Sequence, residues 1–279
     1  MDDFLKSEER TTVEVMKAED NMRILTIDQG NSSAKAALWR GLEPERSLRL
    51  SEMSIEGLLP LLEEGEIEGC VYSSVGHTDA KFLETLRRLV DGRLLVLTAS
   101  TPLPVGIRYS GRATLGNDRV AAAAGATFMF PGESVLVVDA GTAVTIDVIN
   151  REGEFLGGNI APGMTLRFSS LHDATDRLPL VDADGEVLAF GGDTISAIRS
   201  GVVGGMVSEV VDAFQIAERL YGCRRVVLAG YDGQRLLPLL LRRGVEASFH
   251  ANLVGFGLLS IFRHNLYHKV PNDIDIKSE

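Results

Sequence analysis

Cysteine is scarce in this sequence, and the scarcity excludes two kinds of site. The 279 residues include two cysteines, Cys70 and Cys223, which are far apart in the chain. Neither has the paired spacing of a zinc site or a redox motif, and each lies in an apolar run. We therefore interpret both as inert thiols of the core, and such sparing use of cysteine fits a reducing cytoplasm.

Positive charge and long apolar runs are scarce as well. Lys and Arg number 28 against 39 Asp and Glu, which gives a formal net charge of -11. Nucleic-acid backbones are bound by clustered Lys and Arg, so this balance argues against a nucleic-acid partner. No stretch approaches the ~18 consecutive apolar residues that a membrane span needs, so no membrane contact is expected. The charge is still compatible with a small phosphorylated ligand whose contact with the protein is mediated by cations.

Several well-known signatures of catalysis are also missing. The chain has no G-x-x-x-x-G-K-[ST] loop, no protein-kinase catalytic loop and no Gly-x-Ser-x-Gly elbow. The five histidines, His77, His172, His250, His264 and His268, include no H-E-x-x-H zinc motif. Any phosphate chemistry must therefore use other residues.

Apolar runs and amphipathic stretches alternate along the chain, which is typical of α/β proteins. ILTID at 24–28 and AKAALW at 34–39 flank a polar turn and predict a β-hairpin with Asp28 at its end. Helical periodicity predicts helices at 55–64, 81–90, 116–128, 194–220 and 234–243, with apolar strands at 71–75, 94–99 and 225–230.

The hairpin pattern returns in the second half of the chain. VLVVDAGTAVTIDVI at 135–149 is again an apolar run, an Asp-x-Gly turn and a second run, and GEFLGGNIAPG adds a third strand. Superposition places Asp28 on Asp139 and Gly30 on Gly141. One such turn is uninformative, but two that open successive halves in the same order predict an internal duplication. The predicted divisions are a flexible N-terminal extension at 1–22, an N-terminal half at 23–115, a C-terminal half at 116–268 and a tail at 269–279.

The two Asp-x-Gly turns suit a polyphosphate. Glycine lets the backbone approach a ligand closely, and the following amides and hydroxyls can donate to phosphate oxygens. A carboxylate repels phosphate unless a hard cation such as Mg²⁺ lies between them. For a single turn, an aspartate that only accepts hydrogen bonds within the turn is the simpler interpretation. The pair favours a nucleotide site that contains cations.

A third candidate is the sequence Gly116-Asn117-Asp118-Arg119 at a predicted helix start. A carboxylate commonly caps a helix at this place, and the pattern supports capping at least as well as catalysis. In the catalytic interpretation, Asp118 accepts the proton of a substrate hydroxyl group and Arg119 binds anionic oxygens.

The segments DQGNSSAK, LGNDR, DAGTAVTID, GGNIAPG and GDTISAIRSG resemble type III pantothenate kinases in their order and spacing. That family belongs to the superfamily of actin, hexokinase and the heat-shock chaperone ATPase domain. The resemblance extends from Arg23 to the final predicted helix, and it implies two duplicated ribonuclease-H-like (actin-like ATPase) domains with a cleft between them. Ser32 stands where the family usually has threonine, and the stretch SGRAT before Leu115 lacks a proline often found there.

The resemblance also implies an activity, namely ATP-dependent phosphorylation of pantothenate to 4'-phosphopantothenate, the first step of coenzyme A biosynthesis. The implied enzyme is a cytoplasmic homodimer, with residues of both subunits near the pantothenate pocket, and it uses Mg²⁺ with ATP and K⁺ or NH₄⁺. Asp118 would be the catalytic base, Asp28 would lie near Mg²⁺ and Asp139 would bind the monovalent cation. The implied ATP-binding residues are Asp28, Gln29, Gly30, Asn31, Ser32, Ser33, Ala34, Lys35 and Thr142, and the implied pantothenate-binding residues are Tyr109, Gly116, Asn117, Asp118, Arg119 and Thr194.

Two alternatives keep the fold and change the function. One is a non-catalytic regulatory protein, which would have no need for a cluster of aspartates around a cleft. The other is a kinase for a sugar or another small hydroxylated substrate, and the absence of clear sugar-kinase motifs argues against it.

Overall fold

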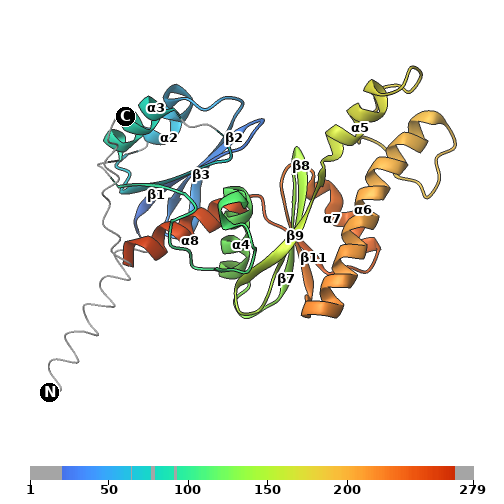
Figure 1. The fold of residues 1–279 in the computed structure, drawn as a ribbon. Helices are drawn as coiled ribbons and strands as arrows, with labels where there is room; N and C mark the ends of the chain where they lie inside the picture. The colour runs from blue at the N-terminus through green and yellow to red at the C-terminus, as the bar shows by residue number, and fades with distance from the viewer. Residues whose placement is uncertain (1–20, 64, 77–78, 91–92, 268–279) are drawn as a thin grey trace.

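The computed structural model describes residues 21–63, 65–76, 79–90 and 93–267. The predicted tail at 269–279 and residues 1–20 of the predicted extension lie outside them. The described chain forms two lobes, each built on one β-sheet (Figure 1). We call the lobe around the sheet of residues 23–96 the first lobe, and the other one the second lobe.

The sheet of the first lobe has five strands in the order β3-β2-β1-β4-β5. The first three form an antiparallel meander, and β4 and β5 run parallel to β1. The sequence pattern did not predict β3, because this edge strand is mostly exposed and its residues are polar. The strands are β1 (Arg23–Gln29), β2 (Ala34–Arg40), β3 (Glu43–Leu50), β4 (Gly69–Ser74) and β5 (Leu94–Val96).

The sheet of the second lobe repeats this order and adds one strand. Its order is β11-β10-β7-β8-β9-β6, so β9-β8-β7-β10-β11 corresponds to β3-β2-β1-β4-β5. The repeat confirms the predicted α/β fold of two duplicated halves. The strands are β6 (Gly106–Ile107), β7 (Val135–Ala140), β8 (Ala143–Ile149), β9 (Glu154–Pro162), β10 (Arg225–Ala229) and β11 (Ala247–Phe249).

Helices cover both sheets and fill the space between them (Figure 1). Two pack on the outer face of the first sheet and three on that of the second, while α4 and α8 lie between the sheets. No helix of the described residues combines the length and apolar character that crossing a membrane requires. The helices are α2 (Ile55–Leu62), α3 (Ala80–Leu89), α4 (Asn117–Met129), α5 (Met164–Asp173), α6 (Thr194–Tyr221), α7 (Gly233–Arg242) and α8 (Leu253–Tyr267), with a 3₁₀ turn at Arg112–Thr114.

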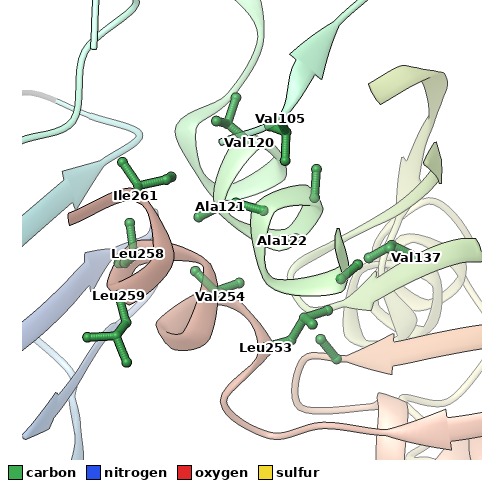
Figure 2. Packing of buried hydrophobic residues seen from close by; sticks show 14 of the residues in the cluster. Val105, Val120, Ala121, Ala122, Val137, Leu253, Val254, Leu258, Leu259 and Ile261 are labelled. Carbon is green, nitrogen blue, oxygen red and sulfur yellow. The ribbon is translucent and has the colours of Figure 1, made fainter. Parts of the chain in front are cut away.

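The central layer depends on small residues that let α4 and α8 approach closely. A side chain at Gly125 would lie 2.2 Å from the carbonyl oxygen of Leu253, and one at Gly257 would lie 1.7 Å from that of Ala121. Figure 2 shows apolar side chains of the two helices meeting here, with Val137 of β7 reaching the same cluster. Helix α8 comes from the end of the chain yet packs on the first sheet, so the two lobes share one core.

The alternation of β1 and β7 aims both turn carboxylates at the space between the lobes. On β1, Ile24 belongs to the central core, whereas Leu25 and Ile27 belong to the outer core. Successive side chains of a strand point to opposite faces, so Asp28 lies on the inner face. On β7, Val135 and Val137 are inner and the next inner position is Asp139. The two strands therefore end with carboxylates that face each other across the gap.

Candidate active site

A cavity of about 520 Å³ lies between the lobes. Both Asp-x-Gly turns, the start of α4 and the turn between β10 and α7 contribute to its walls. The predicted site residues that line it are Asp28, Gly30, Asn31, Ser32, Ser33, Lys35, Asp118, Arg119, Asp139 and Thr142. The fold thus brings together residues up to 114 positions apart, from Asp28 to Thr142.

The first turn is closed by a bond from the Gly30 amide to the Ser33 carbonyl oxygen at 3.0 Å. Two residues of the predicted phosphate-binding stretch point elsewhere. The Gln29 side chain accepts a hydrogen bond from the Tyr72 hydroxyl at 2.5 Å, and Ala34 is buried in the sheet. The turn therefore offers the cleft a mixture of small side chains and the ammonium group of Lys35.

The second turn faces the first across the cleft. The Thr142 hydroxyl donates to the Ser32 hydroxyl at 3.1 Å, so the two turns are in direct contact. Gly163 packs against the back of the second turn, where a side chain would lie 2.0 Å from the Gly141 carbonyl oxygen. Only glycine fits this place, which explains the Gly that ends the GGNIAPG segment.

The carboxylates of Asp28 and Asp139 are held in an environment that disfavours their charge. Burial raises the pKa of Asp28 to about 7, the Asp118 and Asp139 carboxylates add to this, and Lys35 opposes it. Burial also raises the pKa of Asp139 above its ordinary value. Among the described residues, the buried Oδ1 of Asp28 has no hydrogen-bond partner. A buried carboxylate oxygen with no donor, beside a cavity, suits a cation.

Helix α4 brings Asp118 and Asn117 to the cleft from the central layer. The Asp118 carboxylate lies in the first turn of α4, where it accepts a bond from the Arg119 amide at 2.8 Å, and it also lines the cavity. Asn117 does not line the cavity, because its side-chain amide donates to the Leu97 carbonyl oxygen at 3.0 Å. Gly116 is the N-cap residue. These contacts fix the start of α4 to the end of the first sheet.

Arg119 forms a buried ion pair that the sequence did not reveal. Its Nε lies 3.1 Å from each carboxylate oxygen of Asp147, and its Nη2 bonds Oδ1 of the same group. Arg119 is 5% exposed and Asp147 1%. Burial raises the pKa of Asp147, and Arg119 counteracts this. The one indication of such a pair in the sequence was a carboxylate, Asp147, within the otherwise apolar strand segment TIDVI.

Tyr109 and Thr194, like Gly116 and Asn117, are predicted substrate residues that do not line the cavity in a single copy of the chain. Tyr109 packs edge-on against Phe155, with ring centroids 5.9 Å apart, and the Arg119 guanidinium lies 5.8 Å from the Tyr109 ring centroid. Thr194, at the start of α6, lines a separate cavity of about 640 Å³ together with residues of α5. One copy therefore does not bring Thr194 to the cleft.

Other residues of the cleft escaped sequence reasoning. Gly230 and Tyr231 line it from the turn after β10, and Arg49 lines it from β3. Gly230 adopts φ +79, and a side chain there would lie 2.4 Å from the Ala140 carbonyl oxygen. In the sequence, Gly230 could have been noticed as the glycine that follows a predicted strand, at the end of the segment LAG. Nothing in the sequence pointed to Arg49, because β3 itself was not predicted.

This geometry defines a class, the two-lobed kinases and ATPases of the actin-like fold. Solved structures support the fold assignment at low identity. A Campylobacter jejuni protein assigned to the Baf family of transcriptional activators matches with TM-score 0.54 and 24% identity, over 88% of this chain and 99% of that one. A glucokinase from an Antarctic psychrotroph matches with TM-score 0.50 and 11% identity, over 87% and 99%. At such identities the similarity concerns the fold alone.

Sequence comparison shows the family within this class. The family model for type III pantothenate kinase matches residues 24–215. A type III pantothenate kinase of Porphyromonas gingivalis W83 is 36% identical over 245 residues, 87% of this chain and 98% of the relative. One from Phocaeicola vulgatus is 39% identical over 208 residues, 75% and 86% of the two chains. The chain belongs to the type III pantothenate kinase family.

Proposed function

We propose that this chain transfers the γ-phosphoryl group of ATP to pantothenate, the first step of coenzyme A biosynthesis. The observation that carries the proposal is the convergence of two phosphate-suited turns and Asp118 on one cleft, in a member of this family. Two buried, free cysteines fit the cytoplasm as its compartment.

The nucleotide lies between the turns in this proposal, with cations beside the carboxylates. The partnerless Oδ1 of Asp28 fits a ligand of Mg²⁺, which neutralises charge on the phosphates, and Asp139 binds K⁺ or NH₄⁺. Among the described residues, no three His, Cys, Asp or Glu side chains converge as a ready metal site. Mg²⁺ commonly takes few protein ligands and completes its shell with water and substrate phosphates, which agrees with this arrangement.

The chain's own residues would orient pantothenate for in-line attack. Asp118 accepts the proton of the pantothenate hydroxyl group, and phosphoryl transfer then depends on positioning and charge neutralisation. Arg119, which lines the cavity, binds the pantothenate carboxylate with guanidinium N–H groups that do not bond Asp147. Amides and hydroxyls of both turns donate to the phosphates.

We further propose a homodimer through the face formed by α5, α6 and the segment 174–193 that joins them. Large apolar side chains are exposed there without cover from the described chain, among them Phe190 at 92%. Leu180 and Ile195 are exposed on the same part of the chain. Exposed apolar patches of this kind commonly mark protein interfaces. The dimer would also give Thr194 a way to reach the cleft of a second copy.

The test is ADP release from ATP and Mg²⁺, with and without pantothenate, in K⁺ and in Na⁺ buffer. We expect turnover that needs pantothenate and K⁺ and that Asp118→Asn reduces at least ~100-fold, while the variant keeps its ADP affinity. Turnover with sugars instead of pantothenate would reassign the substrate. No turnover from a folded dimer would favour the regulatory alternative.

A further inference from the structure

A row of charged side chains crosses the first sheet at the rim of the cleft. Asp28 on β1 is the register partner of Lys35 on β2, and Lys35 is the partner of Arg49 on β3. Directly opposed residues of antiparallel strands carry their side chains on the same face. The three charges therefore lie side by side, in the order carboxylate, ammonium, guanidinium, along the meander that is blue in Figure 1.

The two cations of this row are not balanced in the same way. Lys35 lowers the pKa of both Asp28 and Asp139, so it has carboxylates nearby. Arg49 forms no ion pair within the part of the chain that the structure describes, and its contact is with the Tyr231 ring, 5.4 Å from Cζ to the centroid. Like charges directly opposite each other in a sheet are destabilising. An anion bound between Lys35 and Arg49 would remove this repulsion.

Arg49 also lies where two cavities meet. The cavity of the cleft and a second one of about 430 Å³ share the walls formed by Asp28, Lys35, Arg49, Gly230 and Tyr231. Arg49 belongs to the first lobe and Tyr231 to the turn after β10 of the second, so their contact crosses from lobe to lobe. The junction is thus lined by two cations and the Asp28 carboxylate from one lobe and by a glycine and an aromatic ring from the other.

We infer that Arg49 is a further nucleotide-binding residue, which binds the polyphosphate chain jointly with Lys35 while Tyr231 supports its guanidinium from the other lobe. The inference rests on the proposed function for the identity of the ligand. A guanidinium can present a planar fork of N–H donors to phosphate oxygens while one face stays on an aromatic ring. Lysine keeps the charge but provides neither the fork nor the flat face.

The experiment compares Arg49→Met and Arg49→Lys with Arg46→Met as the matched control. Arg46 lies on the same strand, donates to the Pro60 carbonyl oxygen at 3.1 Å and lines neither cavity. Binding of Mg²⁺-ATP, Mg²⁺-ADP and AMP is measured by titration calorimetry without pantothenate. KM for ATP and KM for pantothenate are measured separately.

We expect Arg49→Met to weaken ATP and ADP binding by roughly tenfold, because it loses charged hydrogen bonds to phosphate. AMP binding should weaken less, KM for pantothenate should stay within about twofold, and Arg49→Lys should fall between Met and wild type. Arg46→Met should bind all three nucleotides like wild type.

Unchanged ATP binding in Arg49→Met would overturn the inference, and so would equal losses for AMP and ATP, which would place Arg49 at the nucleoside. Because binding is measured without pantothenate, the two proposals can fail separately. A wild-type protein that binds ATP but does not phosphorylate pantothenate would refute the proposed function and leave the role of Arg49 open to the same titration. If the wild type binds no nucleotide, both proposals fail.

Discussion

The two hairpins that face the cleft share a backbone pattern but carry different charges. In the first lobe the row across the strands reads Asp28, Lys35 and Arg49. The corresponding row of the second lobe reads Asp139, Thr145 and Ile160. The duplication has kept the carboxylate in both lobes and the neighbouring cations in one.

This difference indicates how each lobe balances its carboxylate. Asp28 has Lys35 as its neighbour within its own sheet, whereas Asp139 has Thr145 in that position. Lys35, from the opposite lobe, is the basic side chain that lowers the pKa of Asp139. A carboxylate with no cation in its own sheet is the better candidate for a bound monovalent ion, in agreement with the proposed K⁺ at Asp139.

A second difference lies two residues further along the middle strand. The first lobe has Ala37, which is buried in the central core, and the second has Asp147, which is paired with Arg119. The start of α4 is therefore fixed to the second lobe by an ion pair, and to the first by the neutral amide of Asn117. The same helix is thus attached to one lobe by an ion pair and to the other by an uncharged hydrogen bond.

The largest expected effect comes from making the second lobe copy the first at this position. Asp147→Ala should lower the free energy of unfolding by roughly 3–5 kcal/mol, because Arg119 is left buried without a partner. Urea unfolding measures this. Asp147→Ala combined with Arg119→Met should recover much of the stability, since no unpaired charge remains, but not the activity. A loss below about 1 kcal/mol in the single variant would contradict a buried pair.

Removing each turn carboxylate should separate the two cation sites. Asp28→Asn is expected to lower kcat/KM for ATP by roughly 100-fold, or about 2.7 kcal/mol, in any monovalent buffer. Asp139→Asn should instead abolish the difference between K⁺ and Na⁺ buffers. Steady-state kinetics over a range of Mg²⁺ and K⁺ concentrations distinguish the two. Identical responses of both variants would mean that the carboxylates are not specialised.

The stability of the free protein should depend on pH through these carboxylates. The folded pKa of Asp28 is about 7, above the ordinary value of 3.8, so the folded state holds the proton more tightly than the unfolded state. This contribution to stability is complete at low pH and is lost as pH rises from about 4 through 7. Asp28→Asn has no carboxylate to ionise, so it avoids this loss of stability. The variant should therefore be more stable than the free wild-type protein by roughly 1–2 kcal/mol at pH 8.

The second lobe should respond in the same direction. Asp139→Asn should also stabilise the free protein at pH 8, because burial raises the pKa of this carboxylate, although Lys35 lowers it. Denaturant unfolding at pH 5 and pH 8, without nucleotide or metal, provides the measurement. Destabilisation of either Asn variant at pH 8 would show that the carboxylate is already balanced in the free protein.

The smallest expected effect comes from giving the second lobe its own cation. Thr145→Lys places an ammonium group beside Asp139, as Lys35 lies beside Asp28, and should reduce the ratio of rates in K⁺ and Na⁺ by up to about tenfold. Thr145→Met is the control for size without charge. An unchanged ratio in Thr145→Lys would mean that the monovalent ion does not act at Asp139.

Most of the fold could be predicted from the sequence, because each half of the chain has its own pattern of apolar runs and turns. The two apolar runs ending in Asp-x-Gly predicted both hairpins, and helices α4 and α6 begin and end within about two residues of the predicted ranges. Strand β3 was missed, because an exposed edge strand needs no apolar alternation. Because β3 was not predicted, Arg49 was not identified as a candidate site residue.

The candidate site was accessible where a residue lies in a turn and inaccessible where it acts through a partner. Asp28, Asp139 and Thr142 were found because glycine marks their turns. Asp147 was not, since its significance depends on Arg119, which lies 28 positions away and reaches it only through the packing of α4 on β8. Thr194 was assigned to the substrate site by resemblance, and within one copy it lies on another face.

By itself the sequence determined the duplicated halves, the two carboxylate turns and the family, because these follow from local patterns and their order. The tertiary structure decided which charges meet. It placed α4 and α8 between the sheets, where glycines allow close contact, and so brought Asp118 to the same cavity as Asp28 and Asp139. Coulomb interactions depend on distance in space and on burial, and neither quantity can be read from the order of residues along the chain.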